Sequence, residues 1–171
     1  MKLRSRLFVL TGIITMASTI TVGAVGADLA FQSELNRADA SIESVFNASQ
    51  QDGKDPIAAA VEDAMLRTVQ VTVALLDNQN EIVTLQGDDA MITEVPPATS
   101  LVLAEKRAMT IDAVTDYRLR SVSIDNGSHI MIAVEIATIQ SARDANLALI
   151  FSFALIAMAV AKELHKIILI I

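Results

Sequence analysis

Two long stretches of the chain contain no charged residue, and they limit the folds that it can adopt. Residues 7–27, as a helix rising about 1.5 Å per residue, would extend about 30 Å. Residues 145–161 would extend about 26 Å, the short end of what crosses the hydrocarbon core of a bilayer. A buried helix of a soluble protein is the alternative for 145–161, but this stretch has no polar face. The sequence therefore predicts two transmembrane helices, at 7–27 and 145–161.

Basic residues lie at the outer ends of both stretches and predict how the chain is oriented. Lys2, Arg4 and Arg6 precede the first stretch, and Lys162 and Lys166 follow the second. The positive-inside rule places residues 1–6 and 162–171 in the cytoplasm and residues 28–144 outside. A cleaved signal peptide is the rival for 7–27, because small residues at 25–27 match a cleavage site.

Charge and composition exclude several functional classes. The segment 28–144 holds 19 of the 20 acidic residues and 8 of the 13 basic ones, so it offers no basic patch to nucleic acid. Cysteine is absent, and the two histidines do not form a metal-binding pair. No nucleophile motif or glycine-rich nucleotide loop occurs. We expect neither catalytic activity nor a cofactor.

The segment that leads into the second stretch reads as a β-hairpin followed by a helix. An Asn-Gly pair at 126–127 favours a tight turn. After it, apolar and other residues alternate over 129–136, as in a half-buried strand. Before it, residues 117–124 are strand-like. The alternation of apolar and polar residues is interrupted between Leu119 and Val122, which predicts a bulge. Beyond Ile136 the apolar period lengthens to that of a helix.

The remaining outer segment predicts helices first and strands after them. A helix continuing from the first stretch carries one apolar stripe, and Asp55-Pro56 starts a second helix with a stripe from Ile57 to Thr68. Strands follow at 69–75 and 81–86 around a polar turn, while 101–103 and 109–114 fit either a strand or a helix. The predicted fold class is α+β, with four or five antiparallel strands and the long N-terminal helix on one face.

These residues resemble a known family. VTVALLD at 71–77, DYRL at 116–119, DNG at 125–127 and the strand running into the outgoing helix are similar to the N-terminal sensor half of bacterial membrane histidine kinases. The resemblance implies an extracytoplasmic PAS-like domain between two spans in the bacterial inner membrane. It also implies a parallel homodimer. The HAMP relay and kinase domains of such proteins have no counterpart here, so we expect a sensor portion truncated before them.

Three groups of residues are candidate sites. Arg118 and Arg120 share one face of a strand and, with Arg107, would bind a small anionic ligand; a solvated, salt-bridged strand face is the alternative. Carboxylates in the loop at 87–98 would bind a divalent cation, or simply be solvated; they are Asp88, Asp89 and Glu94. The third group is the helical stripe, expected either to form a dimer seam or to cover its own sheet; it consists of Leu35, Ala38, Ile42 and Val45.

Two functional hypotheses follow. The first is a sensory input module of a two-component sensor kinase, which detects an extracytoplasmic ligand or envelope signal and relays it through the helix at 145–161. The second is a membrane-anchored or exported binding protein that transmits nothing.

Overall fold

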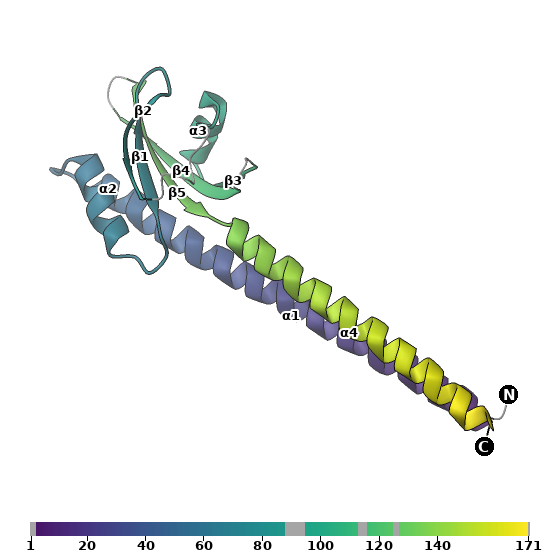
Figure 1. Cartoon of the computed structure of the whole chain (residues 1–171). Coiled ribbons are helices and arrows are strands. Elements are labelled where there is room, and N and C mark those ends of the chain that lie inside the picture. Colours follow the sequence, from purple (N-terminus) through teal and green to yellow (C-terminus); the bar gives the residue numbers. More distant parts are fainter. Residues whose placement is uncertain (1–2, 88–94, 113–115, 125–126, 171) are drawn as a thin grey trace. The chain divides into compact units, whose positions relative to one another are not determined.

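The computed structural model describes residues 3–87, 95–112, 116–124 and 127–170. Its contacts divide the chain into two compact units, one made of residues 33–139 and the other of residues 1–32 with 140–171 (Figure 1). The elements in chain order are α1 (Leu3–Ser49), α2 (Pro56–Met65), β1 (Thr72–Leu76), β2 (Ile82–Gln86), α3 (Ala98–Ala104), β3 (Met109–Ile111), β4 (Tyr117–Ser123), β5 (His129–Glu135) and α4 (Ala137–Ile170). This order confirms the predicted α+β class.

The unit 33–139 is built on a five-stranded sheet in the order β2-β1-β5-β4-β3, with every neighbouring pair antiparallel. The predicted hairpin is present, because β4 and β5 pair from Tyr117↔Glu135 to Ser123↔His129. Residues 125–126 of its turn lie outside the described residues, and Gly127 has φ +77°. β5 occupies the middle of the sheet, and α4 begins two residues after it ends.

Helices cover both faces of this sheet (Figure 1). On one face, α1 and α2 bury Val73, Ile130, Ile132 and Val134. On the other, α3 packs on a second apolar cluster that includes Met131. β5 is consequently buried on both sides, and the half-buried strand predicted there is wrong. The alternation along β5 assigns residues to two cores, because successive side chains point to opposite faces.

The bulge predicted between Leu119 and Val122 is also wrong, because the register of β4 with β5 is unbroken across it. Arg120 and Ser121 caused the apparent slip of the apolar phase. Both are buried but paired: the Ser121 hydroxyl donates to the carbonyl of Leu101 at 2.5 Å, and Arg120 is described below. Polar residues can occupy a core strand when their hydrogen bonds are satisfied. The register instead shifts between β1 and β2, at Leu75/Leu76.

The apolar stripe of α1 packs against the sheet of its own chain. Ala38, Ile42 and Val45 are at most 1% exposed in that core, and only Leu35 is partly exposed. The assignment of these three residues to a seam between subunits is therefore corrected, since no part of their surface is left for a partner. The stripe had to cover the β1–β5–β4 surface, because α2 is too short to cover it alone.

Turn and cap residues behave largely as predicted. Asp55 caps α2, its Oδ1 accepting the amides of Ile57 at 2.8 Å and Ala58 at 3.4 Å. Met65 lies within the apolar stripe predicted from Ile57 to Thr68 but is 67% exposed, and the buried residues of α2 are Ala59, Ala60 and Ala64. Gly87 follows β2 with φ +127°, and a Cβ there would lie 2.6 Å from the hydroxyl oxygen of Thr72. Only glycine fits that position without strain.

The second unit consists of the N-terminal part of α1 and most of α4. A Cβ on Gly23 would lie 3.0 Å from Cδ1 of Ile150, so the two helices approach closely at this glycine. Farther along, Arg143 Nη2 lies 3.2 Å from Asp28 Oδ1, and the Arg143 guanidinium lies 4.9 Å from the centre of the Phe31 ring. Both helices are long and apolar enough to cross a membrane. In each, only 6% of the apolar 18-residue segment is buried.

Candidate functional site

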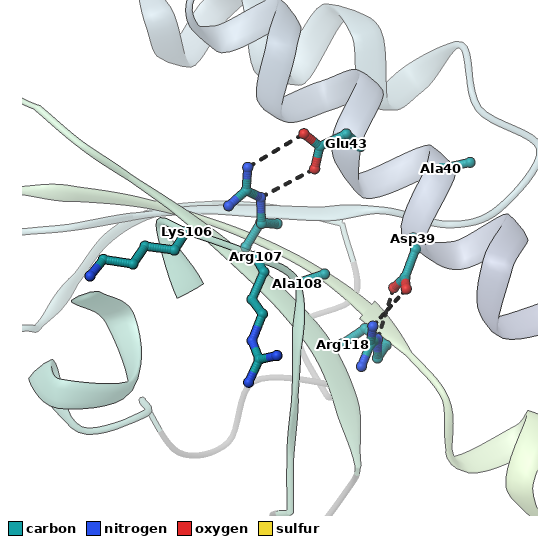
Figure 2. Close-up of a pocket in the computed structure, with 8 residues that line it drawn as sticks. Asp39, Ala40, Glu43, Lys106, Arg107, Ala108 and Arg118 are labelled. Carbon is teal, nitrogen blue, oxygen red and sulfur yellow. Dashed lines mark hydrogen bonds and ion pairs between the residues drawn. The ribbon is translucent and has the colours of Figure 1, made fainter. Parts of the chain in front are cut away.

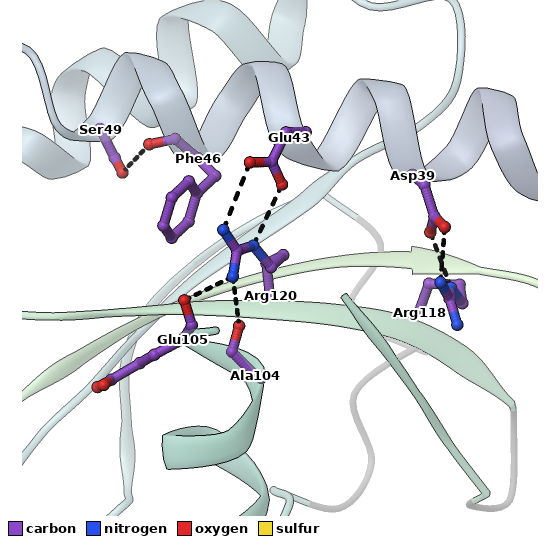
Figure 3. A network of polar contacts seen from close by, with 8 residues as sticks. All are labelled: Asp39, Glu43, Phe46, Ser49, Ala104, Glu105, Arg118 and Arg120. Carbon is purple, nitrogen blue, oxygen red and sulfur yellow. Dashed lines mark hydrogen bonds and ion pairs between the residues drawn. The ribbon is translucent and has the colours of Figure 1, made fainter. Parts of the chain in front are cut away.

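Two arginines of β4 join the sheet to α1, as Figure 3 shows. Arg118 Nε donates to Asp39 Oδ1 at 2.8 Å and its Nη2 donates to Oδ2 at 2.6 Å, a bidentate pair. Arg120 Nε lies 3.2 Å from Glu43 Oε2, and its Nη2 lies 3.4 Å from Oε1. We call these two ion pairs the arginine clasp.

The clasp forms because helix and strand spacings match. Asp39 and Glu43 are four residues apart on α1, which is about 6 Å along a helix axis. Arg118 and Arg120 are two apart on β4, which is about 6.7 Å along a strand. Side chains at these positions also share one face of their element, so Asp39 meets Arg118 and Glu43 meets Arg120.

Arg120 is the more deeply held of the two arginines. Its side chain is 6% exposed, and its Nη1 donates to the carbonyls of Ala104 at 3.1 Å and Glu105 at 2.5 Å. These carbonyls lie at the C-terminal end of α3, where helix carbonyls lack helical partners and a cation is favourable. The guanidinium carbon also lies 3.7 Å from the centre of the Phe46 ring. One buried charge thus links α1, β4 and α3.

An open hollow of about 470 Å³ lies beside the clasp, as seen in Figure 2. Six of its eight lining residues are charged; the lining comprises Asp39, Ala40, Glu43, Lys106, Arg107, Ala108, Arg118 and Arg120. Four bases face two acids, so the lining is cationic although the chain carries a net charge of −7. Such a surface favours anions over apolar molecules or cations.

Lys106 and Arg107, on the loop between α3 and β3, supply the excess positive charge. Both are exposed, and within the described ranges neither side chain has an ion-pair or hydrogen-bond partner. In Figure 2 no dashed line joins either one to Asp39 or Glu43. The Arg118 side chain is 19% exposed and that of Asp39 is 36% exposed, so solvent reaches this ion pair from the hollow.

The structure brings together all three residues predicted to bind an anion, because Arg107, Arg118 and Arg120 line one hollow. Binding itself stays a prediction. The predicted metal ligands Asp88, Asp89 and Glu94 lie outside the described residues. Among the residues that are described, no group of three or more histidines and carboxylates is placed to hold a metal ion.

Sequence reasoning missed the α1 half of this site. The available signal was the position of Asp39, Glu43 and Phe46, each of which directly follows a stripe residue and is spaced i, i+4, i+7. Acids at that spacing, flanking a buried stripe, lie along the border of a helix that packs on a sheet. Lys106 gave no sequence signal beyond its charge.

Comparison with known proteins leaves the family open. No protein-family model matches the chain, and neither does any curated protein sequence. One similar solved structure is the N-acylhomoserine lactone dependent LuxR family transcription factor CepR2 from Burkholderia cenocepacia, at 12% identity and a TM-score of 0.29, covering 70% of this chain and 97% of that one. Another is the sensor domain of the zinc-responsive histidine kinase CzcS from Pseudomonas aeruginosa, at 15% identity and a TM-score of 0.27. The match covers 61% of this chain and 95% of that one. Both TM-scores are low, so functional assignment depends on the geometry of this chain.

Proposed function

We propose that this chain is a membrane-embedded sensory input module, in which the domain at 28–144 lies outside the cytoplasm and acts on the helix at 145–161. The observation that carries the proposal is the continuity of two helices. α1 extends without interruption from the apolar stretch 7–27 to the arginine clasp, and α4 extends from the end of β5 through 145–161. Each of the two helices therefore connects the sheet to one of the uncharged stretches along the chain.

Only one strand, β5, lies between the strand that carries the clasp arginines and α4. The clasp arginines lie on β4, whose neighbour is β5, and Arg118 and Arg120 stand opposite Val134 and Ile132. Only Ile136, which is 1% exposed, separates β5 from α4. Its amide donates to the carbonyl of Asp116 at 3.0 Å, which ties the start of α4 to the start of β4.

The Asp28–Arg143 ion pair supports the two-span arrangement. Asp28 directly follows the first uncharged stretch, and Arg143 precedes the second by two residues. A contact of 3.2 Å between them puts the ends of both stretches at one level. Charged groups at that level would lie at the outer surface of the bilayer, where water and headgroups solvate them.

The finer parts of the assignment remain proposals. They are a PAS-like domain of a two-component histidine kinase, the bacterial inner membrane, both termini in the cytoplasm, no catalytic activity, and a homodimer whose seam would lie outside Ala38, Ile42 and Val45. A binding protein without signalling output is the competing class, because the cationic hollow alone would serve it equally well.

Two experiments test the proposal. Topology reporters fused at Gly87 and after Lys166 should be active outside and inside the cytoplasm, respectively. Residues 1–166 fused to the cytoplasmic half of a sensor kinase should then alter kinase output when Arg118→Ala opens the clasp, whereas exposed Asn36→Ala should not. Identical output from both variants, in chimeras shown to insert and fold, would reject the relay and leave a binding protein.

A further inference from the structure

We propose that the hollow binds a small divalent oxyanion, and that this anion displaces Asp39 from Arg118 and so loosens α1 around Asp39, while the pair between Arg120 and Glu43 stays in place. The proposal rests on the sensory role for its biological meaning, but the binding step stands on the geometry of the clasp alone.

The Asp39 carboxylate shows that the site accepts an oxyanion. Two oxygens already receive two parallel N–H groups from Arg118, at 2.8 and 2.6 Å. A guanidinium fork binds a free carboxylate, phosphate or sulfate with the same geometry. Arg118 Nη1 also donates to Thr110 Oγ1 at 3.1 Å, so the guanidinium stays oriented when Asp39 leaves.

The unpaired bases explain why a free anion would compete with a tethered one. Asp39 brings one negative charge to Arg118, but it forms no ion pair with Lys106 or Arg107, which line the hollow from the loop between α3 and β3. A small dianion is free to contact Arg118 with one group and these bases with the other. The lining carries an excess of two positive charges, which a divalent ligand neutralises and a monovalent one does not.

The two halves of the clasp differ in how easily they exchange. Arg120 is 6% exposed and held by two carbonyls and the Phe46 ring, so it keeps its place. The Arg118–Asp39 pair faces the hollow, and a pair this exposed contributes only about 0.2–1 kcal/mol. We therefore assign ligand exchange to Arg118 and the structural anchor to Arg120.

The mechanism makes a thermodynamic prediction about Asp39. Asp39 and the anion compete for one guanidinium, so removing the carboxylate must strengthen anion binding by the free energy of the lost ion pair. Asp39→Asn should tighten binding by a factor between about 1.4 and 5. Arg118→Gln should abolish it. Arg107→Gln should weaken it several-fold, and because Arg107 is exposed this variant will fold even if Arg118→Gln does not.

The loosening of α1 has its own measurement, because the chain has no native cysteine. Ala38 is 1% exposed on the face of α1 that packs against the sheet, and a cysteine there reacts faster with a maleimide when this part of the helix loosens. Asn36→Cys, which is exposed on the same helix, is the matched control. The test uses the full chain in lipid nanodiscs, with malonate, sulfate or phosphate as the probe and sodium chloride at equal ionic strength as the reference.

The expected result is saturable calorimetric binding of at least one dianion, with faster labelling at position 38 and unchanged labelling at position 36. Which dianion binds most tightly distinguishes a dicarboxylate from a tetrahedral oxyanion. Equal labelling in chloride would reduce the effect to charge screening and overturn the proposal, as would binding that survives in both Arg118→Gln and Arg107→Gln. Anion binding without any change in the kinase output of the chimera would reject the sensory function but support the hollow as an anion-binding site.

Discussion

Replacing Arg120 with methionine removes a buried charge that contacts α1, β4 and α3, and the loss of stability follows from these contacts. The carbonyls of Ala104 and Glu105 each lose a charged donor, worth about 1–2 kcal/mol per bond. The cation–π contact with Phe46 adds about 1 kcal/mol. The ion pair with Glu43, whose side chain is 50% exposed, adds at most about 1 kcal/mol.

One term opposes these losses. Methionine fills a similar volume without burying a charge, which recovers about 1–2 kcal/mol of desolvation. The net expectation is that Arg120→Met lowers the free energy of unfolding by about 3 kcal/mol, the middle of the range of about 1–5 kcal/mol that these contributions give together. Arg118→Met is the matched control on the same strand and face. It loses one partly exposed ion pair and the exposed hydrogen bond to Thr110, and should cost about 1 kcal/mol.

Tyr117 provides the assay. It is the only tyrosine in a chain without tryptophan, it is 1% exposed, and it starts β4. Its fluorescence during urea titration of the full chain in detergent therefore reports on the sheet and not on the apolar helices. Equal urea midpoints for Arg120→Met and Arg118→Met would refute the distinction between anchor and exchange site. A variant Arg120→Met more stable than the parent would show that the burial penalty outweighs every contact described.

Three further predictions concern glycines and a cap. Gly87→Ala should cost about 2–3 kcal/mol by the same fluorescence assay, because it adds a clash to a strained φ; Gly53→Ala, with φ +80° in open space, should cost about 1 kcal/mol. Gly23→Leu should reduce several-fold the disulfide crosslinking between cysteines placed at the outer ends of the stretches 7–27 and 145–161. Gly12→Leu should not reduce it, because nothing lies within 4 Å of a Cβ at that position. Asp55→Ala should lower the stability of the sheet unit by about 1 kcal/mol and Asp55→Asn by much less, since asparagine also caps a helix; equal losses would argue against capping.

Local signals in the sequence predicted much of the fold, because they depend on residues close together in the chain. The hairpin before α4, the cap at Asp55 and the continuous first helix all follow from turn chemistry, capping and apolar periodicity. The two uncharged stretches are likewise a property of composition, and both lie in helices long enough to span a bilayer. The shared face of Arg118 and Arg120 followed from the two-residue period of a strand.

Pairings between distant residues were decided only in the tertiary structure. Arg118 and Asp39 are 79 positions apart, and nothing in either segment names the other as its partner. Whether the stripe through Ile42 covered its own sheet or a second subunit depended on how much of the sheet α2 left uncovered. The false bulge in β4 has the same origin, since local patterns treat a polar residue as exposed. Arg120 and Ser121 can be buried because groups elsewhere in the chain, at Glu43, Ala104 and Leu101, accept hydrogen bonds from them.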